Sequence, residues 1–177
     1  AGLKEGEVVI EGDVGDYVGI LNHGAKIYVK GNAGNFAGNN MMSGLLVIEG
    51  NAGDGCGHGM YGGTLYIKGN AGKHLGVINK KGTIVVGGNA GDEVGLYMVG
   101  GDIVILGDAG EHLGNWIIRG NIYIAGAWKS LGRNAKETAL TEEDKAKLES
   151  LFKDLGITAD LSKFKKVVPE KVRPFYG

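Results

Sequence analysis

The sequence predicts an all-β fold: a right-handed parallel β-helix, or solenoid, of about seven 19-residue coils, followed by a tail with one α-helix and an extended segment. Three observations favour this fold. A glycine octet of the form G-x-x-G-x-x-x-G recurs every 19 residues, a short segment with strand character precedes each octet, and all but two of the 35 glycines lie within the first 132 residues. Self-similarity at a fixed period of this length is typical of stacked repeat proteins.

The glycine octets set the register of the coils. Nineteen residues at roughly 3.3 Å each span about 60 Å when extended, which suits one coil with tight glycine corners. The octets begin at Gly12, Gly31, Gly50, Gly69, Gly88 and Gly107, and a degenerate seventh copy begins at Gly126. The repeat positions of the four central octets are Gly31, Asn32, Gly34, Gly38, Gly50, Asn51, Gly53, Gly57, Gly69, Asn70, Gly72, Gly76, Gly88, Asn89, Gly91 and Gly95. Because these asparagines stack in successive coils, we expect an amide ladder that hydrogen-bonds from coil to coil.

The seven segments that precede the octets are expected to be strands. They read EVVIE, KIYVK, LLVIE, TLYIK, TIVVG, DIVIL and NIYIA. Their second and fourth residues are aliphatic, and the period of two places both on the inner face. Their middle residues form an outward stripe that is also apolar: Val9, Tyr28, Val47, Tyr66, Val85, Val104 and Tyr123. An outward stripe in contact with water would usually be polar, so the tail or another protein should cover it, with Tyr28, Tyr66 and Tyr123 as candidate contacts.

The chain divides into two parts of different composition. Residues 1–132 carry the repeat, and residues 133–177 form the tail. In the tail, Thr141 begins the capping-box-like sequence TEED, and apolar residues follow at helical spacing up to Gly156, so a helix over about 142–155 should dock on the solenoid. An extended segment up to Pro169 follows. Trp128, in the last coil, is expected to close the C-terminal end of the bore.

The composition narrows the class of function. With 19 basic and 20 acidic residues, neither sign of charge dominates, so we expect no dedicated nucleic-acid or anionic-membrane surface. One cysteine excludes a disulfide framework, a cysteine-rich zinc site and an iron–sulfur cluster held by this chain alone. No apolar run reaches 18 residues, so we expect no membrane span and no leader. A cytoplasmic protein that binds protein partners fits best, and a homo-oligomer is left open.

Few residues suggest a chemical site. Cys56 occupies a column of otherwise aliphatic residues, so it is expected to pack in the core, and His58 has no matching histidine in other coils. His74, Glu93 and His112 share one column on successive coils and are weak candidates for a metal site, because coils about 4.8 Å apart leave the two histidines roughly 9.6 Å apart. A β-helix enzyme such as a polysaccharide lyase would need clustered acidic and basic groups, which the columns do not show. We assign no catalytic and no cofactor-binding residue to this chain.

The octets and the end of the tail resemble a known family. The octet in a 19-residue repeat resembles the GXGXG domain, the right-handed β-helix at the C-terminus of the glutamate synthase large subunit. The octet GDVGDYVG is similar to that family's first-coil motif, and FKKVVPEKVRPFY is similar to its closing segment. The resemblance covers roughly residues 7–176. The same repeat occurs in the C subunit of formylmethanofuran dehydrogenase, a molybdenum or tungsten enzyme.

The resemblance implies a non-catalytic scaffold in ammonia assimilation and glutamate biosynthesis. In glutamate synthase, a glutaminase domain releases ammonia, and an FMN and iron–sulfur domain uses it to make glutamate from 2-oxoglutarate. This chain, as a stand-alone subunit or an excised domain, would then bind a glutamine amidotransferase and an FMN-binding synthase, and the partner would carry the FMN and the iron–sulfur cluster. The alternative is the scaffold C subunit of formylmethanofuran dehydrogenase.

Overall fold

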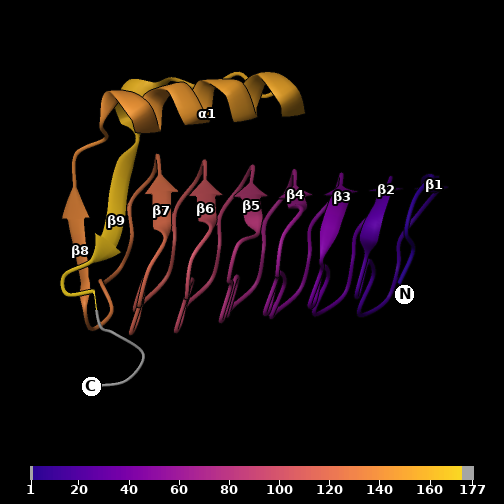
Figure 1. Cartoon of the computed structure of the whole chain (residues 1–177), viewed down its shortest axis with the longest axis horizontal. Coiled ribbons are helices and arrows are strands. Elements are labelled where there is room, and N and C mark those ends of the chain that lie inside the picture. Colours follow the sequence, from indigo (N-terminus) through magenta and orange to yellow (C-terminus); the bar gives the residue numbers. More distant parts are fainter. Residues whose placement is uncertain (1, 173–177) are drawn as a thin grey trace.

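The protein is a row of stacked strands with one helix along its side. Figure 1 shows the computed structural model, which describes residues 2–172. One sheet runs through the molecule in the order β1-β2-β3-β4-β5-β6-β7-β9-β8. The parallel solenoid strands are β1 (Glu7–Ile10), β2 (His23–Val29), β3 (Ser43–Ile48), β4 (Thr64–Ile67), β5 (Thr83–Val86), β6 (Asp102–Ile105) and β7 (Asn121–Ile124). These seven strands make about six turns, so the predicted parallel solenoid is confirmed.

Each solenoid strand pairs with the strand that lies 19 residues later in the sequence. Val8 lies opposite Ile27, and Ile84 lies opposite Ile103. One irregularity interrupts this register between β2 and β3, where His23 lies opposite Ser43. The spacing of the octets therefore predicts the register of the sheet.

The tail contains the predicted helix and extended segment, together with a strand that was not expected. Its elements are β8 (Ala135–Thr138), α1 (Glu142–Leu155), a 3₁₀ turn (Leu161–Lys163) and β9 (Lys165–Pro169). Thr141 is the N-cap of α1 and forms a capping box with Asp144, and the helix ends at Gly156, whose φ is 69°. Both helix boundaries agree with the sequence. The last part of the predicted tail, residues 173–177, lies outside the described residues.

Apolar side chains fill the bore of the solenoid. From β2 to β7, the two inward residues of each strand are at most 5% exposed. The alanines of the central octets pack beside them. Cys56 is fully buried in the same cluster, and its thiol donates to the carbonyl oxygen of Gly53 at 3.3 Å. The prediction that Cys56 is a core residue is therefore confirmed.

Cys56 should be unreactive in the folded protein. Burial raises the pKa of its thiol to about 11, and the thiolate is the form that reacts. We expect no labelling by a chromogenic disulfide reagent at about pH 8 until denaturant is added, and then one thiol per chain. Labelling of the native protein at the rate of an exposed thiol would contradict this burial.

Ladders of side chains join the octets of neighbouring coils. In the main ladder, the Oδ1 atom of each Asp or Asn after the first glycine accepts a hydrogen bond from the backbone N–H 19 residues later, at 2.7–2.8 Å. The ladder therefore hydrogen-bonds from coil to coil as expected, but the donor is the backbone N–H of the next coil and not its side-chain amide. Corner N–H groups need an acceptor, and a carboxylate supplies one as well as an amide, which explains Asp13 and Asp108 in this column.

The ladders also explain why the octets need glycine. A Cβ atom at Gly53 would overlap the Oδ1 of Asn35, and one at Gly72 would overlap the Oδ1 of Asp54 and the backbone of the coil below. These glycines therefore allow two neighbouring coils to approach each other closely. Gly76, at the end of its octet, has a φ of 67°, a conformation that residues other than glycine adopt at a cost.

The two ends of the solenoid differ. At the C-terminal end, β9 inserts antiparallel between β7 and β8, and Val167 of β9 is fully buried in the core. Trp128 packs half-buried against this core, at the end where it was expected. The insertion of β9, which also closes this end of the bore, was not expected. At the N-terminal end, β1 is the edge strand, and a cavity of about 240 Å³ reaches Val8 and Ile10.

Candidate functional site

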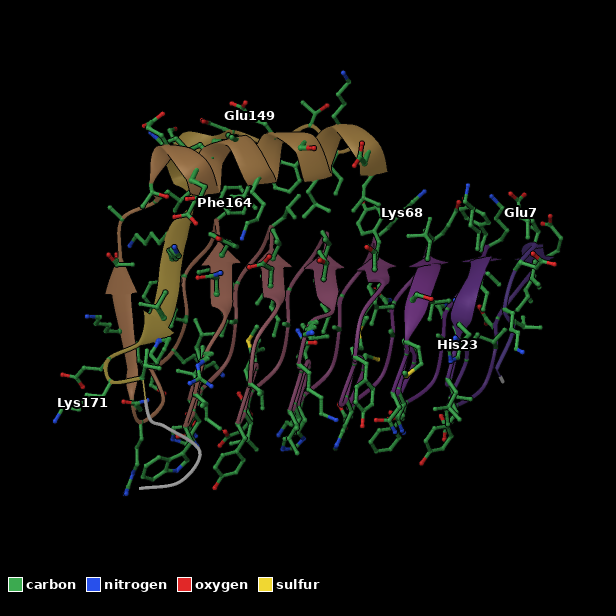
Figure 2. All side chains as sticks on the ribbon, in the orientation of Figure 1. Glu7, His23, Lys68, Glu149, Phe164 and Lys171 are labelled. Atoms are coloured by element: carbon green, nitrogen blue, oxygen red, sulfur yellow. The ribbon has the colours of Figure 1, made fainter. Side chains whose placement is uncertain are left out.

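The tail covers most of the outward apolar stripe. Leu148 and Phe152 of α1 pack in one cluster with the stripe from Val47 to Tyr123. Phe164 joins this cluster, with its ring 5.7 Å from that of Phe152. Figure 2 shows Phe164 beneath α1, on the solenoid side of the helix. Of the two covers left open by the sequence, the structure shows the protein's own tail.

The three tyrosines singled out by the sequence differ in their surroundings. Tyr123 is fully buried and Tyr66 is 9% exposed, both in the cluster with α1. Tyr28 is only partly buried. It lines a groove of about 240 Å³ that lies beyond the end of the helix, between β2 to β4 and Leu155. The stripe therefore continues past α1 on the N-terminal side, where Val9 is 46% exposed.

A buried polar cluster fastens the tail to the last coil. The hydroxyl of Tyr123 on β7 donates to Oδ1 of Asp144 at 2.7 Å. Lys166 on β9 donates to both carboxylate oxygens of Asp144, at 2.9 Å each, and the backbone N–H of Thr141 donates to Oδ2 at 2.8 Å. Asp144 is 5% exposed. These contacts connect β7, α1 and β9 at one point.

The electrostatics of this cluster are those of a satisfied ion pair. Burial, followed by the hydrogen bond to Asp144, raises the pKa of Tyr123 above its ordinary value. Burial alone would raise the pKa of Asp144, but hydrogen bonds from Lys166, Thr141 and Tyr123 outweigh it and hold that pKa well below its usual range. Asp144 is therefore ionised at neutral pH and compensated by Lys166. The cluster serves as a structural lock.

The weak metal candidates are only partly brought together. Nδ1 of His112 lies 3.1 Å from Oε1 of Glu93, and Oε2 of Glu93 accepts a hydrogen bond from Asn115. Within residues 2–172, no three His, Cys, Asp or Glu side chains are grouped so that they could hold a metal ion, and His74 does not complete such a set. The same described part of the chain contains no helix with the length and apolar character needed to cross a membrane.

Two buried asparagines were not anticipated from the sequence. Asn22 and Asn79 are at most 1% exposed. The amide of Asn79 donates to the carbonyl oxygen of Gly82 and accepts from its N–H, both at 2.9 Å, and Asn22 makes the same pair of bonds with Ala25. Both side chains satisfy the backbone of a turn that leads into a strand. The sequence signal that could have indicated them is an asparagine followed by a glycine just before a strand: N-x-x-G at Asn79 and N-H-G at Asn22.

Comparisons with known proteins agree with this architecture. The profile described as the GXGXG motif matches residues 1–170. No curated protein sequence matches the chain. Among solved structures, a chain of the formyltransferase/hydrolase complex (FhcABCD) from Methylorubrum extorquens, crystallised with methylofuran, is similar with a TM-score of 0.74 and 32% identity.

That similarity covers 86% of this chain and 60% of the matched chain. The chain thus spans less than two thirds of the length of this structural relative. The family profile, in contrast, covers nearly the whole chain, including the solenoid and most of the tail. The chain therefore belongs to the GXGXG motif family.

Proposed function

We propose that this chain is a non-catalytic scaffold in a multi-subunit complex that transfers or hydrolyses formyl groups on a carrier of the methylofuran type. The observation that carries this proposal is the similarity in fold and sequence to a chain of the formyltransferase/hydrolase complex. It favours the formylmethanofuran dehydrogenase alternative over the glutamate synthase interpretation. If the complex is the dehydrogenase, its molybdenum or tungsten centre would lie on partner subunits. Transfer and hydrolysis of a formyl group change no oxidation state and need no such centre.

The chain's own contacts support a structural role. The ladder residues of the octets bond to the backbone of the next coil, Cys56 is packed in the core, and Asp144 is held by Lys166 and Tyr123. Parallel strands in constant register form an elongated body whose outer faces can hold several partners at fixed distances.

Glutamate synthase is the second candidate. It is favoured by the closing segment FKKVVPEKVRPFY, which begins at Phe164 and includes β9. In that case the partners would be a glutamine amidotransferase and an FMN-binding synthase, with FMN and the iron–sulfur cluster on the synthase. The last residues of this segment, 173–176, lie outside the described part of the chain.

Purification of the complex through an affinity tag on this chain tests both candidates. Partners identified by mass should include proteins that transfer or hydrolyse formyl groups, and the chain purified alone should turn over no formylated carrier. Recovery of a glutaminase and a flavoprotein would replace the first candidate by the second. Turnover by the isolated chain would contradict a scaffold role in either complex.

A further inference from the structure

One long edge of the solenoid is built from the turns that precede the strands. We call this the turn edge and define it as residues 19–25, 38–44, 57–63, 76–82, 95–101 and 114–120. In Figure 1 the solenoid strands point toward α1, so the turns before them lie along the side away from the helix. Figure 2 shows side chains with rings along that side. Arg133 and Asn134 bond to Asn115 and Ile117 of the last segment, but α1 lies on the opposite side. The described part of the tail, up to residue 172, therefore leaves the first five segments of the turn edge uncovered.

Large apolar side chains are exposed on the turn edge. Leu21, Tyr61, Ile78 and Tyr97 are 37–48% exposed, and they make up half of the exposed large hydrophobic residues within 2–172. They come from four different coils, so they form a row along the edge. A row of this kind, rimmed by polar groups, is typical of a protein interaction site.

The backbone holds several of these side chains outward in the left-handed conformation. Ile78, Tyr97 and Trp116 share one column and have φ values of 52–55°. The same column contains Asn40 and Gly59, which accept this conformation far more readily. A β-branched or bulky residue is strained there. Residues without strain are available to this turn, yet Leu21, Ile78 and Tyr97 are large, apolar and exposed there, which indicates a use for them on the surface.

The turn edge is also segregated by charge. Its six seven-residue segments contain no Asp or Glu, but they contain Lys80, Lys81 and Arg119. The six octet segments that precede them, 12–18, 31–37, 50–56, 69–75, 88–94 and 107–113, contain seven acidic residues. The basic and aromatic groups are in contact: Nζ of Lys80 lies 3.6 Å from the centre of the Tyr61 ring. The edge is therefore apolar and basic.

We propose that the turn edge is the docking surface for another protein subunit, whose contacting surface places carboxylates around an apolar centre. Aromatic anchors with a charged rim are the usual carriers of binding energy in such interfaces, and the absence of acidic residues on this edge favours an acidic partner. A second copy of this chain in a two-fold contact would face Lys80 and Lys81 with the same edge, so repulsion disfavours it. Nucleic acid is disfavoured because the edge carries only three cations, Lys80, Lys81 and Arg119, too few for a surface that follows a phosphate backbone.

The test uses the complete chain with a tag, expressed in its native cell. One variant combines Tyr97→Asn, which suits the left-handed backbone, with Lys80→Glu and Lys81→Glu. The matched control combines Tyr17→Asn, at another exposed tyrosine with positive φ, with Lys136→Glu and Lys163→Glu, two exposed lysines of the tail. Recovery of the wild-type partner is measured by mass spectrometry, and a photo-cross-linking residue in place of Tyr97 identifies the partner segment.

We expect the turn-edge variant to recover at most about one tenth of the partner that the wild type recovers. The control should recover as much partner as the wild type. Raising NaCl from about 50 to about 500 mM should weaken wild-type retention, because exposed charges are screened. The cross-linked partner segment should be rich in Asp and Glu.

Equal recovery with both variants, cross-linking to a second copy, or cross-linking to nucleic acid would overturn the proposal. This docking surface rests on the proposed function in one respect only, namely that a partner subunit exists. If the recovered partners do not act on formyl groups but are lost with the turn-edge variant, the docking surface stands and the proposed function fails.

Discussion

Replacing Gly72 by alanine is expected to lower the free energy of unfolding by about 3 kcal/mol or to prevent folding, the cost of overpacking a site that cannot relax. A Cβ atom at Gly72 would overlap the Oδ1 of Asp54 and the backbone of Gly53. Relief would require the coils to separate, which would also stretch the ladder bond from Asp54 to the N–H of Lys73, now 2.8 Å long. Equilibrium unfolding in urea, followed by circular dichroism, measures the effect.

Gly15 is the matched control, because it occupies the same octet position on the first coil. A Cβ atom there would meet no atom within 4 Å, and the backbone does not have a positive φ. Gly15→Ala should therefore be neutral or stabilise by about 0.4–1 kcal/mol, through the lower entropy of the unfolded chain. Equal effects at Gly15 and Gly72 would contradict the stacking of coils at this corner.

Asp144→Ala should cost about 3–5 kcal/mol, because removal of one partner leaves the other charge buried and unpaired. The charge left behind is Lys166, whose side chain is 15% exposed, and Tyr123 loses its acceptor. The substitution also removes the capping box at the start of α1. Hydrogen exchange of residues 142–155 should become fast, as α1 leaves the stripe, and the free energy of unfolding should fall.

Neighbouring Glu143 provides the control for this lock. It is exposed in the same helical turn, so Glu143→Ala should stay within about 0.5 kcal/mol of the wild type. Asp144→Leu combined with Lys166→Met should recover much of the loss, since apolar pairs often replace buried ion pairs without cost. Unchanged exchange of α1 in Asp144→Ala would show that the lock does not hold the tail.

The pH dependence follows from the direction of the shift at Asp144. Its pKa in the folded protein lies below its ordinary value, so its contribution to stability is present above the unfolded pKa of about 3.9 and is lost as the pH falls toward the folded value. The difference in stability between wild type and Asp144→Ala should be constant near neutral pH and shrink below about pH 4. A difference that vanishes already near pH 6 would contradict a low pKa.

The repeat made the solenoid predictable. A residue 19 positions later has the same environment, so the aliphatic columns, the octet glycines and Cys56 could be placed without a structure. The tail has no such repetition. Insertion of β9 between β7 and β8 depends on pairing of segments far apart in the sequence, for instance Ile122 with Val167, and no local pattern reports that pairing. The helix and the extended segment of the tail were predictable, but β8 and the arrangement of these elements were not.

The functional surfaces were less visible than the fold. Tyr123 could be singled out because it belongs to a column, but Asp144 and Lys166 lie in charged runs that suggest solvent exposure. Their pairing becomes evident only when α1 and β9 meet over β7. The turn edge was missed for a related reason. Its apolar residues follow neither a strand nor a helix period, since left-handed residues such as Tyr97 direct them outward.

A scaffold should be required for assembly and not for chemistry. The partner subunits recovered with the tagged chain can be purified separately and mixed with and without it, and the mass of the product measured by light scattering after gel filtration. We expect one complex that contains all subunits only when this chain is present, and separate partners when it is left out. Formation of the same partner complex without this chain would contradict the scaffold role.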